Sequence, residues 1–187
     1  MQSYDYAHRQ GVQEISWTEF AGLAARLAEG LAQARVEMVV GTARAGLFPA
    51  TAVACSLRCE LYPVRVTRPV NDEIKYKQPV WRVPVPPDVA GKVVAVVDEI
   101  ADTGETLAML ASEVRAQGAA RVVTAALVSH SWASPAPDVC ALVSDALVIF
   151  PWDRQVLMNG KWQPHPELVE AIRAQVLFTP CQAKDEG

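Results

Sequence analysis

Apolar residues along this 187-residue chain fall into short Val- and Ala-rich runs, and stretches of helical periodicity separate most of these runs. Continuous apolar runs are typical of strands that are buried on both faces. We therefore predict strands over 36–40, 61–66, 80–85, 92–97, 121–128 and 141–149. Periodic apolar positions and end signals predict four helices. The first begins at a capping box, Ser16-Trp17-Thr18-Glu19, and the second ends at about Arg58. The third covers 106–117 before Gly118, and the fourth covers 166–176. Strands alternating with helices predict an α/β fold, with a mostly parallel central sheet flanked by helices.

The most informative segment follows the run Val93–Val97, which is expected to be a strand ended by Asp98 and Glu99. The carboxyl end of such a strand is where open α/β sheets hold ligands. Carboxylates there suit ribose hydroxyls or a hydrated Mg²⁺. Asp102 follows, and an acid beside a phosphate loop can accept a proton. Backbone amides at a helix start favour a phosphate, and the residues that would supply them are Thr103, Gly104, Glu105 and Thr106.

A simpler reading of this segment is structural. Asp98 and Glu99 would then only end a strand, and Asp102 and Thr103 would only cap a helix. Three acids and a Thr-Gly-x-Thr sequence after one apolar strand favour the ligand-binding interpretation. Neither a Walker A loop nor the Gly-x-Gly-x-x-Gly of a dinucleotide site is present in the sequence.

A second strand, turn and helix occurs at Val39–Ala50. Arg44 follows the strand and can make charge-assisted bonds to pyrophosphate oxygens. Ala45 and Gly46 are small, so their backbone N–H groups can approach the same anion. An ordinary βα turn is the alternative reading of this segment.

The segment Val96–Leu107 resembles the phosphoribosyl pyrophosphate (PRPP) motif of type I phosphoribosyltransferases, and Val39–Ala50 is similar to their pyrophosphate loop. The resemblance implies that a base displaces pyrophosphate from PRPP, with Mg²⁺ as the cofactor. It implies that Arg44, Ala45 and Gly46 contact pyrophosphate, that Asp98 and Glu99 hold the ribose hydroxyls and the metal, and that Asp102 removes the proton from the base. The family loop more often contains Arg-Gly-Gly, so Ala45 is a departure.

A third segment, Ile149–Asp153, resembles the Pro-Trp-Glu/Asp sequence of xanthine- and hypoxanthine-guanine-type enzymes, which implies a purine acceptor and Asp153 as a further metal ligand. Relatives bind the purine 6-oxo group with a lysine, and here His130 is nearest to that position. Leu147 stands where relatives have a stacking aromatic residue, and Val148 offers backbone groups to the base. The accepted base is therefore left open between usual purines, an unusual purine and another base.

Composition fits an ordinary enzyme, with 51% hydrophobic and 20% charged residues. The alternative function is a PRPP-sensing, nucleic-acid-binding regulator of the same fold. A formal net charge of −4 counts against it, because a broad nucleic-acid surface is usually basic. Four cysteines without a Cys-x-x-Cys pair predict reduced thiols and a cytoplasmic location. Neither a signal segment nor an apolar run of membrane-spanning length is recognisable, so no membrane partner is expected.

The length predicts one domain over residues 1–187. We expect its core over about 30–130, and a small hood from about 1–15 and 130–165. The polar, proline-bounded segment 68–79 is predicted to be a lid, in which Arg68, Lys75 and Lys77 are candidates to meet phosphates. The family resemblance further implies a homodimer.

Overall fold

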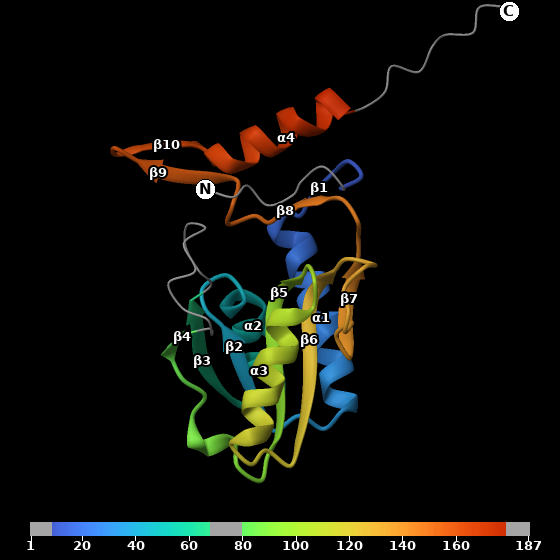
Figure 1. Ribbon diagram of the computed structural model, residues 1–187, viewed down its shortest axis with the longest axis vertical. Helices are drawn as coiled ribbons and strands as arrows, with labels where there is room; N and C mark the ends of the chain where they lie inside the picture. Colours follow the sequence, from blue (N-terminus) through green and yellow to red (C-terminus); the bar gives the residue numbers. More distant parts are fainter. Residues whose placement is uncertain (1–8, 68–79, 179–187) are drawn as a thin grey trace, which may run out of the picture. The chain divides into compact units, whose positions relative to one another are not determined.

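The computed structural model describes residues 9–67 and 80–178 and divides the chain into two compact units (Figure 1). The larger unit is Thr18–Ser144. The smaller unit joins the two ends of the chain, Met1–Trp17 and Asp145–Gly187. The predicted hood segments 1–15 and 130–165 overlap this smaller unit only in part, because residues 130–144 belong to the larger unit. The predicted lid at 68–79 lies outside the described residues.

A six-stranded sheet forms the centre of the larger unit, in the order β4-β3-β2-β5-β6-β7. All neighbouring strands are parallel except β3 and β4, which are antiparallel. The mostly parallel α/β architecture is therefore confirmed. The strands are β2 (Met38–Thr42), β3 (Glu60–Thr67), β4 (Val80–Val83), β5 (Val93–Ala101), β6 (Arg121–Ser129) and β7 (Val139–Val143).

Helices cover both faces of this sheet. They are α1 (Trp17–Gln33), α2 (Leu47–Leu57) and α3 (Glu105–Ala116), with a short 3₁₀ helix η2 (Pro87–Val89). The buried residues of α3 belong to one apolar cluster with Met38, Val40, Val94 and Val96. Since side chains alternate along a strand, the intervening Val39, Ala95 and Val97 face the other side. The buried residues of α1 and α2 are outside that cluster, and Figure 1 shows α1 behind the sheet and α3 in front of it.

Two strand predictions were wrong in their limits. The run 141–149 is not one strand, because the chain leaves the sheet after Val143 and a separate strand, β8 (Leu147–Ile149), follows. The polar pair Ser144-Asp145 marks this break. Asp98 and Glu99 do not end β5, which pairs with β6 as far as Ala101. The apolar run of β6 is equally long, so backbone pairing continues past the two acids. Gly118 follows α3 with φ of 91°, as its predicted stop position requires.

The smaller unit contains short elements that sequence patterns did not predict. Strand β1 (Val12–Glu14) pairs in parallel with β8, and β9 (Gln155–Met158) forms an antiparallel hairpin with β10 (Lys161–Pro164). The helix α4 (Pro166–Phe178) follows and agrees with the predicted helix. Within residues 9–67 and 80–178, no helix has both the length and the apolar character that crossing a membrane requires.

Candidate active site

The order of strands in the larger unit creates a natural ligand position. In the sheet, β2 connects to β3, its neighbour on one side, whereas β5 connects to β6, its neighbour on the opposite side. Adjacent strands with connections in opposite directions form a topological switch point, where open α/β sheets bind ligands. The loop after β2 contains Arg44, and the loop after β5 contains Asp102. The two strongest sequence motifs are therefore brought to the same edge of the sheet.

The loop after β2 lies tightly against β5. The Thr42 hydroxyl donates to the carbonyl oxygen of Val97 at 3.2 Å, and the peptide bond between Ala43 and Arg44 is cis. A Cβ atom at Gly46 would lie 2.6 Å from Asp98 Oδ1 and 2.7 Å from the Thr42 carbonyl oxygen. Only glycine fits this position without movement of its neighbours. The side chain of Arg44 is exposed at the same loop.

Asp98 is buried where these two segments meet. Asp98 is 7% exposed, and its Oδ1 accepts a hydrogen bond from the Glu99 N–H at 2.9 Å. The same oxygen lies close to Gly46. This carboxylate therefore has a clear structural contact with the loop that holds Arg44. Glu99 is half-buried and more open to solvent.

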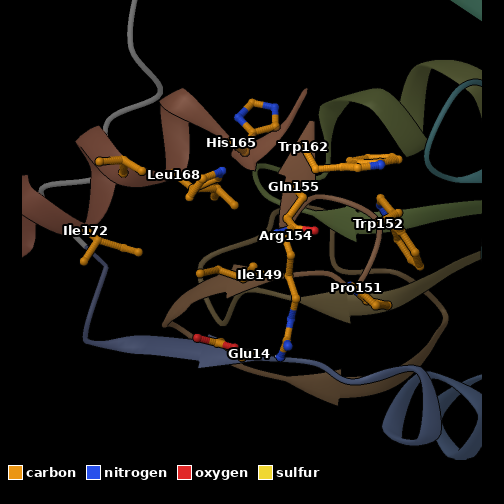
Figure 2. Close-up of a pocket in the computed structure, with 12 residues that line it drawn as sticks. Glu14, Ile149, Pro151, Trp152, Arg154, Gln155, Trp162, His165, Leu168 and Ile172 are labelled. Carbon is orange, nitrogen blue, oxygen red and sulfur yellow. Dashed lines mark ion pairs between the residues drawn. The ribbon is translucent and has the colours of Figure 1, made fainter. Parts of the chain in front are cut away.

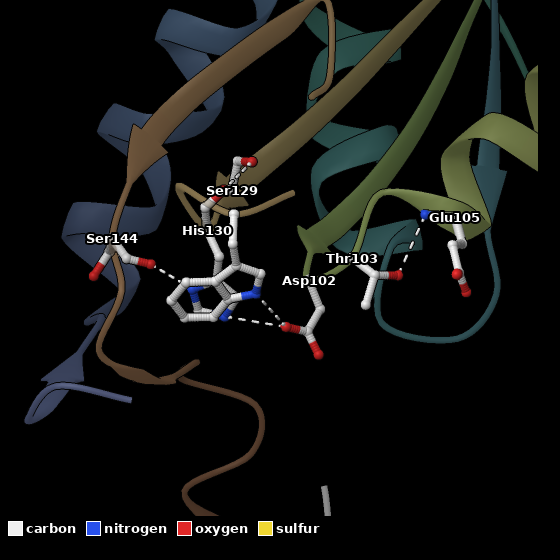
Figure 3. A network of polar contacts seen from close by, with 7 residues as sticks. Asp102, Thr103, Glu105, Ser129, His130 and Ser144 are labelled. Atoms are coloured by element: carbon white, nitrogen blue, oxygen red, sulfur yellow. Dashed lines mark hydrogen bonds and ion pairs between the residues drawn. The ribbon is translucent and has the colours of Figure 1, made fainter. Parts of the chain in front are cut away.

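The loop after β5 leads directly into α3. Gly104 has φ of 85°, and a Cβ atom there would collide with the carbonyl oxygen of Pro135. The Glu105 N–H donates to the Thr103 hydroxyl oxygen at 3.4 Å, as Figure 3 shows. Gly104 is the N-cap of α3 and has no side-chain cap, so the Thr103 hydroxyl contacts the first helical residue without capping the helix. Thr103 and Glu105 are exposed and Thr106 is half-buried, at a helix end whose amides and dipole favour an anion.

Asp102 faces His130, which follows β6 (Figure 3). Asp102 Oδ1 lies 3.8 Å from His130 Nε2, and His130 Nδ1 lies 2.5 Å from the carbonyl oxygen of Ser144. The side chain of His130 is fully buried, whereas that of Asp102 is 27% exposed. The contact of His130 with a base, which we predicted from the sequence, stays a prediction.

Trp132 contacts two of the candidate site residues, and sequence reasoning did not single it out. Its indole ring stacks on the imidazole of His130, with centroids 4.4 Å apart and planes at 16°. Its Nε1–H donates to Asp102 Oδ1 at 3.4 Å. The only sequence signal was an aromatic residue shortly after a strand, and such residues are common in loops.

The other predicted site residues belong to the smaller unit. Leu147 and Val148 are buried in β8, and Asp153 is half-buried in a turn where its N–H donates to the Phe150 carbonyl oxygen at 3.0 Å. The structure does not place these residues relative to the larger unit. Their roles toward a base or a metal therefore stay predictions.

A pocket of about 710 Å³ lies within the smaller unit (Figure 2). The motif residues Pro151 and Trp152 line it, together with Trp162 and His165. Arg154 and Glu14 point toward one another in this pocket and form an ion pair of 2.6 Å. The pocket has the volume of a small-molecule site.

The described residues contain no group of three or more His, Cys, Asp or Glu side chains arranged to hold a metal. Mg²⁺ in phosphate-transferring enzymes is usually bound by one or two carboxylates plus substrate oxygens. Asp98 and Glu99 supply carboxylates of this kind, and their part in binding a metal stays a prediction.

Comparisons with known proteins agree with this geometry. Residues 13–157 match the family model described as "Phosphoribosyl transferase domain". The solved purine phosphoribosyltransferase of Pyrococcus horikoshii is 28% identical, with a TM-score of 0.69 over 79% of this chain and 98% of that chain. A search of curated proteins found no match.

Two further solved structures show the same fold at lower identity. The xanthine-guanine-hypoxanthine phosphoribosyltransferase of Helicobacter pylori is 18% identical, with a TM-score of 0.64 over 78% of this chain and 93% of its own. A hypothetical protein of Neisseria gonorrhoeae with bound ppGpp is 21% identical, with a TM-score of 0.66 over 90% of this chain and 99% of its own.

Proposed function

Because this chain belongs to the phosphoribosyl transferase domain family, we propose that it moves a 5-phosphoribosyl group from PRPP to a purine base and releases pyrophosphate. The observation that carries the proposal is the meeting of two anion-binding loops at one switch point, with Asp102 beside them. The 28% identical purine phosphoribosyltransferase supports a purine as the acceptor.

Each loop has a separate role in this proposal. Arg44, Ala45 and Gly46 bind the departing pyrophosphate, and Thr103–Thr106 bind the 5′-phosphate through backbone amides and hydroxyls. Glu99 contacts the ribose hydroxyls, while buried Asp98 keeps the pyrophosphate loop in position. Asp98 and Glu99 would hold Mg²⁺, which would supply positive charge that neutralises the departing pyrophosphate.

Asp102 acts as the general base. The ring nitrogen of the purine attacks the anomeric carbon, the bond to pyrophosphate breaks with its electron pair, and the nitrogen's proton moves to the Asp102 carboxylate. Positive charge on the ribose ring develops during this step, and nearby carboxylates stabilise it electrostatically. A neutral Asn at position 102 would keep the size of the side chain but not its basicity.

The test is pyrophosphate release by the purified chain with Mg²⁺ and PRPP. Hypoxanthine, guanine, xanthine, adenine, uracil and orotate would be offered separately. We expect release with at least one purine and none with the pyrimidines. The D102N variant should turn over about 10²–10⁴-fold more slowly while its calorimetric affinity for PRPP is kept. Release only with a pyrimidine would contradict the purine assignment, and loss of PRPP binding in D102N would contradict the role of the base.

A PRPP-sensing regulator that binds nucleic acid is the second candidate. The matched Neisseria gonorrhoeae protein carries ppGpp, so this fold also occurs with a nucleotide ligand. Filter binding of DNA and RNA with and without PRPP, and calorimetry with ppGpp, would test this function. PRPP-dependent retention of nucleic acid without turnover of any base would favour the regulator. We further propose a homodimer, which light scattering coupled to size-exclusion chromatography would detect.

A further inference from the structure

The loop after β6 is fastened to the loop that contains Asp102. The His130 N–H donates to the Ala101 carbonyl oxygen at 3.1 Å, and the Ser134 N–H donates to the Thr103 carbonyl oxygen at 2.8 Å. The backbone of Pro135 also approaches Gly104 too closely to permit a side chain there. Residues on the β6 loop therefore hold a fixed position relative to Asp102.

His130 has one ring orientation within this arrangement. A carbonyl oxygen only accepts hydrogen bonds, so the 2.5 Å contact with Ser144 assigns a proton to Nδ1. Nε2, on the other side of the ring, then faces Asp102 Oδ1 at 3.8 Å. Because the imidazole is also buried, it provides a rigid surface for the ring that stacks on it.

Trp132 occupies that surface and reaches the carboxylate. The indole lies almost parallel to the imidazole, and its N–H donates to the same Asp102 oxygen that faces Nε2. Trp132 is 43% exposed, although tryptophan side chains are mostly buried. The indole N–H therefore holds Asp102 through Oδ1, and the stacked imidazole supports the indole, which restricts the rotation of the carboxylate group.

We propose that Trp132, supported by His130, is a positioning residue for Asp102. By fixing Oδ1, the indole N–H directs the carboxylate toward the nitrogen of the incoming base. A general base must be held within about 0.5 Å and 10–20° of its productive geometry, and contacts from neighbouring side chains provide this restraint. This inference rests on the proposed transferase function, and it adds a specific residue to that site.

The W132F variant tests the proposal because it removes the N–H but keeps an aromatic ring. We expect kcat to fall about 10-fold, with the KM for PRPP and the melting temperature unchanged. W17F is the matched control, since Trp17 is an exposed tryptophan on α1, and its kcat should equal that of the unmodified chain. In a D102N background, W132F should cause no additional loss, because the group that Trp132 positions has already been removed.

Other outcomes would overturn the proposal. An unchanged kcat in W132F would do so, as would an equal loss in the D102N background. A W132L variant that raises only the KM for the base, while W132F behaves normally, would instead make Trp132 a stacking surface for the purine.

A second readout does not depend on catalysis. The indole N–H resonance of Trp132, assigned in a ¹⁵N-labelled protein by its absence in W132F, should shift in D102N. A resonance that does not move would reject the hydrogen bond and with it the proposal. If the unmodified chain turns over no base but this resonance shifts, the transferase function fails while the contact between Trp132 and Asp102 stands.

Discussion

Gly46 is the residue at which the loop after β2 packs against Asp98 of β5. A G46A substitution would place a methyl group 2.6 Å from Asp98 Oδ1, next to backbone that cannot move freely. We expect the free energy of unfolding to fall by about 1–3 kcal/mol, as for other overpacked sites. The affinity for Mg²⁺-PRPP should fall at least 10-fold, because the pyrophosphate loop must shift. Thermal unfolding and calorimetry would measure the two effects.

Gly22 provides the matched control for this substitution. It lies within α1, and a Cβ atom there would meet nothing within 4 Å. Alanine has the higher helix propensity, so G22A should stabilise the protein by up to about 1 kcal/mol and leave PRPP affinity unchanged. Equal PRPP binding by G46A and G22A would mean that the close approach at Gly46 has no part in the site.

The cysteines offer a test of burial at single residues. Desolvation raises the pKa of the Cys59 and Cys140 thiols, so less thiolate is present at a given pH. The thiolate is the reactive form, and Cys55 is exposed. Of the three cysteines that the structure describes, we expect iodoacetamide at pH 8 to modify Cys55 first and Cys140 last, as followed by peptide mass spectrometry. Faster modification of Cys140 than of Cys55 would show that the end of the sheet is more open than the structure describes.

The positions of the candidate site residues in the fold were more predictable than their environments. Arg44, Gly46 and Asp102 could be selected from local order alone, since each follows a recognisable strand and precedes a helix. The role of Trp132 depends on contacts between loops separated by about one β-α-β unit, and no local pattern encodes that distance. The burial of His130 likewise follows from Trp132 and Ser144, which the sequence separates from Asp102.

Among the elements, those of the central sheet were the easiest to predict. A strand buried on both faces needs a continuous apolar run, and β2, β5 and β6 each have one. Strands β1, β9 and β10 are three or four residues long and largely exposed, so they carry too few apolar positions for a pattern. The division of 141–149 depends on which partner each half finds, β6 for the first and β1 for the second.

The central and edge strands of the sheet should differ in their sensitivity to mutation. Val96 in β5 is fully buried, whereas Val143 in the edge strand β7 is 65% exposed. V96A removes two buried methyl groups, which costs about 1.5–3 kcal/mol of unfolding free energy. V143A should cost less than about 1 kcal/mol, mostly through strand propensity. Urea unfolding of both variants would measure the difference, and equal losses would contradict the assignment of β5 to the centre.

At the scale of the whole molecule, the two units differ in how they are stabilised. The larger unit has a six-stranded sheet with helices on both faces, and most of the buried apolar side chains belong to it. Among the described residues, the smaller unit has only two-stranded sheets and one helix that lies entirely within it. It contains exposed Trp17, Leu157 and Trp162. Pairs of strands without further neighbours are only marginally stable in water.

Hydrogen exchange should therefore separate the two units. Amides of β2, β5 and β6 lie in the interior of a paired sheet, so they exchange only when much of the larger unit opens. Amides of β9 and β10 belong to an exposed hairpin and should exchange through local opening, at least 10²-fold faster. Mass spectrometry of peptic peptides after deuterium labelling would measure both rates. Equal protection of the hairpin and the central strands would mean that the smaller unit does not open independently.

Added Mg²⁺-PRPP should slow exchange at the loops after β2 and β5 more than at the hairpin, because both loops belong to the proposed ligand site.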